Sequence, residues 1–179
     1  MAAVPTALVI LFILSRSPHL AHGIGATIVF TVAAALALAA GSFRTALNVS
    51  RPEAEPSRQW LAVPAAILII GIGLELMRMP VGTWPARLIG DNPFACFACV
   101  LLLSLPILAG ALLALRQGAP TRPRTSGAMA GLLAGGVTAA LYTLHCPEDS
   151  LLFVTAWHVP AILLVALLGA VLGERVLRW

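Results

Sequence analysis

The stretch CFACVLLLSLPILAGALLAL, residues 96–115, decides the class of fold, because it is twenty residues long and carries no charged side chain. About 20 apolar residues in a helix are enough to cross the hydrocarbon core of a bilayer. Lipid offers no hydrogen-bond partner to the backbone, so a crossing segment must pair its own N–H and C=O groups, as a helix does. The stretch therefore predicts a membrane-spanning helix.

The composition of the whole chain agrees with this prediction. Of its 179 residues, 60% are hydrophobic and only 10% are charged, whereas roughly 25% are charged in typical globular proteins. This balance excludes a water-soluble domain, and it also excludes a disordered chain, which would be rich in charge. We predict an all-α, polytopic membrane helix bundle that forms a single transmembrane domain over residues 1–179. About six spans are expected, the first one short: residues 1–14, 24–41, 60–77, 96–115, 127–144 and 151–172.

The arginines indicate how such a bundle is oriented. All eleven basic residues are arginines, and six crossings place eight of them on the side of the two termini and three on the other side. Basic residues in short loops favour the cytoplasm, so both termini are predicted to be cytoplasmic. The arginines are dispersed and lack interleaved aromatic residues, which does not fit a protein that binds nucleic acid directly.

The reactive side chains collect at the outer ends of the predicted spans. Cys96 begins the fourth span, Cys99 lies one turn deeper, and Cys146 closes the fifth span. Three further candidates for this site are neighbours of Cys146 in the chain: His145, Glu148 and Asp149.

Three interpretations of the cysteines remain open. Two cysteines at the ends of adjacent helices can form a disulfide when their Cα atoms come within about 7 Å. Thiolates beside histidine and carboxylates can instead bind a soft metal ion such as zinc or copper. Free cysteines are also often no more than small buried hydrophobic residues. The residues alone therefore identify neither a metal nor a cofactor.

The carboxylates and hydroxyls near the outer ends support structural roles better than chemical ones. Glu75 and Arg78 predict an ion pair at the end of the third span, and the run from Glu148 to Ser150 predicts the start of the next helix, with Asp149 or Ser150 as its N-cap. The chain contains no H-E-x-x-H, G-x-S-x-G or phosphate-binding glycine motif. We therefore expect no enzyme, and a small transporter or a structural membrane subunit stays as the alternative.

Three glycines predict a close helix contact. Gly127, Gly131 and Gly135 are spaced four apart and lie on one face of the fifth span. Small residues at this period let helix backbones approach each other in lipid. The face is expected to pack inside the bundle or against a second copy of the chain.

The second half of the chain resembles a known family. Segments NPFAC (92–96), LRQGAPTRP (115–123), AGLLAGG (130–136), LYTLHCPEDS (141–150) and LRW (177–179) are similar to the negative regulator of sigma F family. The resemblance implies a six-span anti-sigma factor of the bacterial inner membrane, which holds an extracytoplasmic-function sigma factor at the cytoplasmic face. It also implies that oxidants or heavy metals release this partner through two cysteines on the outer side.

The resemblance assigns these roles to particular residues. Cys96 and Cys146 match the two sensor cysteines of the family, and Cys99 matches neither. No cofactor is implied beyond a transient metal ion at the cysteines. Family members usually begin with a polar cytoplasmic segment, so either such a segment precedes residue 1 or the sigma factor docks on the inner loops and tail. The arginines expected to contact it there are Arg116, Arg122, Arg124, Arg175 and Arg178.

Overall fold

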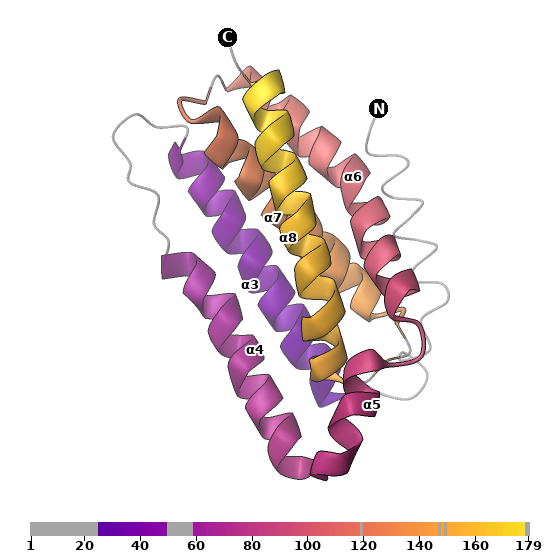
Figure 1. Ribbon diagram of the computed structural model, residues 1–179. Coiled ribbons are helices and arrows are strands. Elements are labelled where there is room, and N and C mark those ends of the chain that lie inside the picture. The colour runs from indigo at the N-terminus through magenta and orange to yellow at the C-terminus, as the bar shows by residue number, and fades with distance from the viewer. Residues whose placement is uncertain (1–24, 50–58, 119, 147, 149, 178–179) are drawn as a thin grey trace.

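Helices account for almost all of the chain that the computed structural model describes, which is residues 25–49, 59–118, 120–146, 148 and 150–177 (Figure 1). No strand occurs among these residues. The elements are α3 (Ala26–Val49), α4 (Gln59–Arg78), the 3-10 helix η1 (Val81–Thr83), α5 (Trp84–Ile89), α6 (Pro93–Gln117), α7 (Pro123–Thr143) and α8 (Leu151–Val176). The all-helical part of the prediction is thus confirmed for the described residues.

Fewer than six of the described helices qualify as membrane spans. Three are long and apolar enough to cross a bilayer, namely Thr27–Ala46 within α3, Pro93–Gln117 and Leu151–Val176. A fourth is reached only if α4 is joined to η1 and α5, across a break where the chain bends by 118°. The predicted span at residues 1–14 lies outside the described residues.

Helix α7 explains part of this difference. It forms close to the predicted residues 127–144, but glycine, alanine and threonine dominate its sequence. These small side chains are less hydrophobic than leucine or isoleucine, so α7 alone does not reach the apolarity of a span. Its composition suits a helix surrounded by other helices.

Two helices also extend beyond the apolar runs that predicted them, α3 at its C-terminal end and α6 at its N-terminal end. Helix α3 continues past residue 41 to Val49, where the Thr45 hydroxyl donates to the Gly41 carbonyl over 2.7 Å and so hides its polarity inside the helix. Helix α6 begins three residues before Cys96, at Pro93. Proline suits the first helical position because the missing N–H would have had no partner there.

Helix α7 packs between α3, α6 and α8, and its residues Gly127, Gly131 and Gly135 lie against α8. A Cβ atom added at Gly131 would lie 2.5 Å from the Cα of Ala166, and one added at Gly127 would clash with the carbonyl oxygen of Gly169. Gly135 would bring a Cβ to within 3.0 Å of the Ile162 side chain. The glycine face is therefore an internal contact between α7 and α8.

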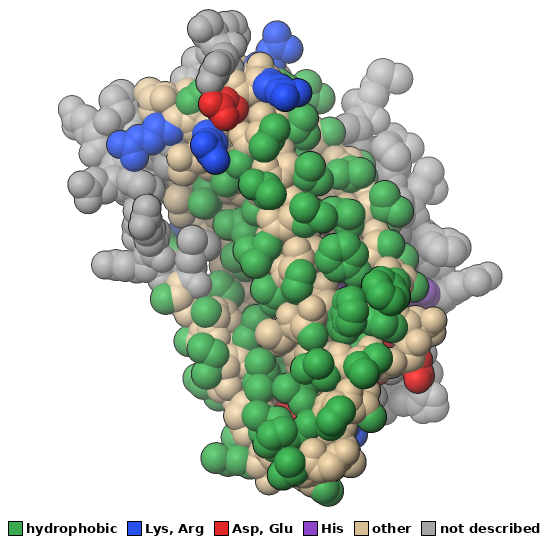
Figure 2. All heavy atoms as spheres, in the orientation of Figure 1, with side chains coloured by type: hydrophobic (Ala, Val, Ile, Leu, Met, Phe, Trp, Pro, Cys, Tyr) green, Lys and Arg blue, Asp and Glu red, His purple; other side chains and the backbone are tan. Residues whose placement is uncertain are grey.

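The flank of the bundle is apolar where it is not covered by other helices. Large hydrophobic side chains are exposed on α4, α6 and α8, including Ile69, Leu102 and Leu163. Figure 2 shows such side chains over the length of the bundle, with the charged ones gathered toward its ends. A continuous apolar belt of this kind would be unusual on a soluble monomer.

Candidate functional site

Cys96 and Cys146 lie together in the core at one end of the bundle, here called the cysteine end. Cys96 stands on the first turn of α6, where its N–H donates to the Asn92 carbonyl, and Cys146 follows α7 and donates its N–H to the Tyr142 carbonyl. Their Sγ atoms are 3.5 Å apart, and the two residues are 4% and 2% exposed. A disulfide has an S–S distance of about 2.05 Å. The two thiols therefore need only a small shift to form a disulfide bond.

Aromatic rings from α7 and α8 enclose the sulfur atoms. The Tyr142 hydroxyl lies 3.7 Å from the Cys96 Sγ and donates to it. The ring of His158, which is 1% exposed, makes edge contacts with the rings of Tyr142 and Phe153, at centroid distances of 5.8 and 6.4 Å. Neither His158 nitrogen has a hydrogen-bond partner among the described residues. Tyr142, Phe153 and His158 are absent from the predicted site. The position of Tyr142 four residues before Cys146 could have suggested it, whereas no local spacing relates Phe153 or His158 to the cysteines.

The environment of Cys146 keeps it protonated. The hydrogen bond with the Cys96 sulfur and, to a lesser degree, burial raise the pKa of the Cys146 thiol above its ordinary value. Loss of the proton would place a negative charge beside the Cys96 sulfur in a region with little water. The two sulfur atoms share one hydrogen bond, in which either thiol can be the donor.

The other predicted members of the site are less closely involved. Cys99 is half-buried, one turn further along α6, and packs on the same core cluster as Cys96. His145 lies with its ring 6.2 Å from that of Tyr142. Asp149 lies outside the described residues. Within the described part of the chain, no three His, Cys, Asp or Glu side chains are arranged to hold a metal ion.

Glu148 and Gly90 join the two segments that carry the cysteines. The Glu148 Oε1 accepts the Asp91 N–H over 2.8 Å, just before α6 begins. Gly90 has φ of 61°, and a Cβ there would lie 2.5 Å from the Phe153 ring and 3.0 Å from the Glu148 carboxylate. Only glycine combines this backbone conformation with such close approach. Residues 90–92, here called the cover, thus pack closely on Phe153 and Glu148 in the turn just before α6.

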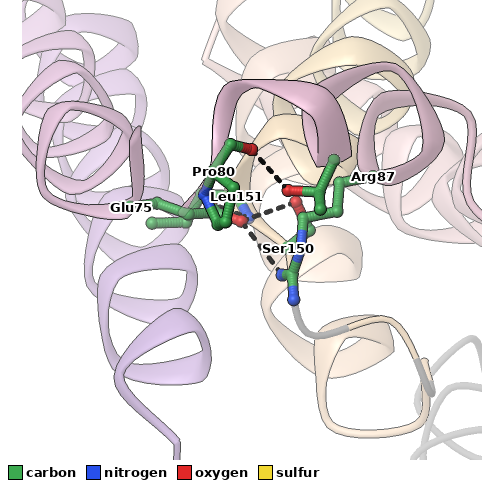
Figure 3. Close-up of polar contacts among 6 residues, drawn as sticks. Glu75, Pro80, Arg87, Ser150 and Leu151 are labelled. Carbon is green, nitrogen blue, oxygen red and sulfur yellow. Dashed lines mark hydrogen bonds and ion pairs between the residues drawn. The ribbon is translucent and has the colours of Figure 1, made fainter. Parts of the chain in front are cut away.

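Glu75 forms a polar junction between α4, α5 and α8 (Figure 3). Its Oε1 accepts from the Ser150 hydroxyl over 2.8 Å, and its Oε2 accepts the Leu151 N–H over 2.7 Å. Arg87 of α5 places Nη1 3.5 Å from Oε1. Ser150 occupies the N-cap position of α8, as predicted, but its side chain makes no cap bond. The carboxylate of α4 instead caps α8 from outside.

The predicted ion pair of Glu75 with Arg78 is wrong. Arg78 is exposed, and the cation beside Glu75 is Arg87. The 118° bend between α4 and the η1–α5 segment turns the chain back, which brings Arg87 to a carboxylate twelve residues earlier. Spacing along one helix could not reveal this contact, because it depends on the bend.

Four of the five arginines expected to contact the sigma factor lie at the opposite end of the bundle, here called the arginine end, where Figure 2 shows most of the basic side chains gathered. Arg116 closes α6, Arg122 and Arg124 flank the start of α7, and Arg175 stands in the last turn of α8. All four are exposed, and Arg178 lies outside the described residues. At 1.5 Å rise per helical residue, Arg116 is about 30 Å from Cys96 along α6.

Comparison with known proteins relates the chain to bacterial regulators. It is 36% identical over 146 residues to the probable anti-sigma-F factor NrsF of Azospira oryzae, which covers 79% of this chain and 68% of that protein. It is 38% identical over 135 residues to the anti-sigma-F factor NrsF of Caulobacter vibrioides, which covers 74% and 63%. The matched part is about two thirds of the length of either relative.

The family itself is established over the full sequence. No solved structure matches the chain. The sequence profile described as negative regulator of sigma F, in contrast, matches residues 1–179. The chain therefore belongs to the negative regulator of sigma F family.

Proposed function

We propose that the protein is an anti-sigma factor of the bacterial inner membrane whose cysteine pair, Cys96 and Cys146, controls release of the sigma factor. Family membership and the names of both relatives support the regulatory role and argue against an enzyme. The observation that carries the sensor assignment is the buried sulfur–sulfur distance of 3.5 Å. The sigma factor is of the extracytoplasmic-function class and binds at the cytoplasmic face.

The apolar flank and the arginine distribution support the membrane placement. The bundle crosses the bilayer with six spans, and both termini are cytoplasmic. The arginine end faces the cytoplasm, where short basic loops are favoured. Sigma-factor contacts are assigned to this end, through Arg116, Arg122, Arg124, Arg175 and Arg178.

Oxidation at the cysteine end supplies the signal. The two thiols lose two electrons and two protons and form one disulfide bond, while hydrogen peroxide accepts them and leaves as two water molecules. The sulfur atoms then move from 3.5 Å to about 2.05 Å apart. Two thiolates can also bind a heavy-metal ion, which likewise draws the sulfurs into a fixed geometry. Either change biases the bundle between two packings that differ by a few kcal/mol.

Serine substitutions test this function directly. Cys96→Ser and Cys146→Ser should each abolish the induction of a sigma-dependent reporter by peroxide or a heavy-metal salt, with normal amounts of protein in the membrane fraction. Cys99→Ser is the matched control, since Cys99 shares the helix and core cluster but not the sulfur contact. Normal induction in both single mutants would show that the pair is not the sensor.

A further inference from the structure

We propose that Glu75 couples the cysteine pair to α4, so that closure of the pair moves α4 relative to the rest of the bundle. This inference rests on the proposed function, because it concerns how the signal leaves the cysteine end. It makes Glu75 a positioning residue and α4 the element that carries the signal to the arginine end.

Two short hydrogen bonds join α4 to the residues that follow Cys146. Glu75 holds both Ser150 and Leu151, at 2.8 and 2.7 Å, only four and five residues after Cys146. Its carboxylate is 9% exposed and faces the N-terminus of α8, where the helix dipole favours negative charge. Hydrogen bonds to an ionised carboxylate are about twice as strong as neutral ones. The start of α8 and the outer end of α4 should therefore move together.

Side chains from two other segments hold the described residues that follow Cys146. Glu148, two residues after Cys146, accepts the Asp91 N–H, and Glu75 accepts from Ser150 and Leu151, which are the N-cap and the first residue of α8. Shortening the sulfur–sulfur distance by about 1.5 Å, to a disulfide, displaces Cys146, Cys96 or both. Because Glu148 is held to the turn before α6, the displacement passes along the chain to Ser150 and Leu151, and from there to Glu75.

The middle of α4 is loosely packed, so the helix can respond. An apolar cavity of about 310 Å³ lies between α4 and the helices α3, α7 and α8, with Pro64, Ala65 and Leu68 forming its α4 wall. On the outer side, Ile69 and Met77 are 69% and 86% exposed. A tilt of α4 therefore disturbs fewer contacts than a movement of α7, which packs against α3, α6 and α8.

The N-terminal end of α4, which is far from Glu75, contacts an arginine of α3 whose position would change with such a tilt. Trp60, in the first turn of α4, packs against Gly41 of α3. A Cβ added at Gly41 would lie 3.1 Å from the Trp60 Cβ. The Arg44 guanidinium stands over the Trp60 ring at 5.0 Å. Arg44 is exposed in the half of α3 that leads to the arginine end (Figure 1). Movement of α4 would thus change a cationic surface near the proposed docking face.

Hydrogen exchange on the full chain in lipid nanodiscs tests the coupling. Amide exchange of α4 is measured with the cysteine pair reduced and after peroxide treatment, and the disulfide is quantified by mass in the same samples. Oxidation should change α4 exchange about fivefold in the wild type, the scale of one lost hydrogen bond. In Glu75→Gln this change should disappear although the disulfide forms to the same extent. Ser150→Ala removes one of the two bonds and should give an intermediate change if Glu75→Gln does not fold.

Arg78→Gln is the matched control, because it removes a charge three residues away on α4 from an exposed side chain. On oxidation, the amide exchange of α4 in this variant should change as much as in the wild type. Equal exchange changes in Glu75→Gln and the wild type would overturn the coupling and leave the sensor assignment intact. A disulfide and an α4 response without loss of a co-purified sigma factor would instead overturn the proposed function and leave the coupling. Absence of the disulfide in peroxide-treated wild type would overturn both.

Discussion

The sulfur atoms of Cys96 and Cys146 lie 3.5 Å apart although fifty residues separate the two cysteines in the chain. The contact exists because α6 begins at the end of the bundle where α7 ends, so that the start of one helix meets the chain leaving the other. Both side chains are buried, and the turn at residues 90–92, just before α6, packs closely on Phe153 of α8 and on Glu148. The pair is therefore poised for a bond but shielded from large reagents.

Because the cysteines are buried, small and bulky thiol reagents should react with them at different rates. Hydrogen peroxide should convert Cys96 and Cys146 to a disulfide in the folded protein, whereas a bulky, polar maleimide should label Cys146 slowly. The rate should be about tenfold or more below that in denaturing detergent, since each 1.4 kcal/mol of opening free energy contributes a factor of ten. Mass spectrometry after timed quenching measures both reactions. Equal labelling rates in the folded and denatured protein would contradict the burial.

Gly90 should control this shielding. Gly90→Ala adds a Cβ that meets the Phe153 ring at 2.5 Å, at a residue with φ of 61°. The cover must move away from α8, so maleimide labelling of Cys146 should accelerate several-fold. Gly82→Ala is the control in the neighbouring 3-10 helix, because a Cβ there meets nothing within 4 Å. Unchanged labelling in Gly90→Ala would mean that residues 90–92 do not restrict access.

Gly131 should be essential for the α7–α8 contact. In Gly131→Leu the new side chain points at the Ala166 Cα and the Val165 carbonyl, where even a Cβ would be only 2.5 Å away. Backbone cannot yield as a flexible side chain can, and forced overpacking costs about 1–3 kcal/mol or more. The midpoint of thermal unfolding in detergent should fall accordingly. Gly110→Leu should leave it nearly unchanged, because a Cβ at Gly110 meets nothing within 4 Å. Equal midpoints in the two variants would refute the close contact.

Long apolar runs were enough to predict that the chain is helical, whereas the pairing of Cys96 with Cys146 was implied only by the resemblance to the family. Helix α8 begins at Leu151, as expected, and the four-residue glycine spacing correctly marks a close helix contact. The partner of that contact is α8, which the spacing alone left open. Periodicity fixes the face of a helix but not the element that covers it.

The contacts around Glu75 could not be predicted, because they arise from tertiary geometry. Its partners Ser150 and Leu151 lie 75 and 76 residues away, and its ion pair with Arg87 requires the sharp bend after α4. The same holds for His158 beside the cysteine pair. Rules based on spacing along one helix find neighbours at three or four residues, and so they suggested Arg78 instead.

The arginine end should contribute to sigma-factor binding mainly through the association rate. Arg122 and Arg124 are exposed at the start of α7, about 30 Å from the cysteines along the helix axis. The double variant Arg122→Gln, Arg124→Gln should slow association with the sigma factor several-fold and weaken its salt dependence, because rim charges act chiefly by steering. Both effects are measured by immobilising the protein in nanodiscs on a surface and recording the association rate of the sigma factor at low and high salt. Arg78→Gln, which removes an exposed charge at the cysteine end, should associate as the wild type does. An equal loss in Arg78→Gln would attribute the effect to net charge, and the docking face would then have to be sought elsewhere.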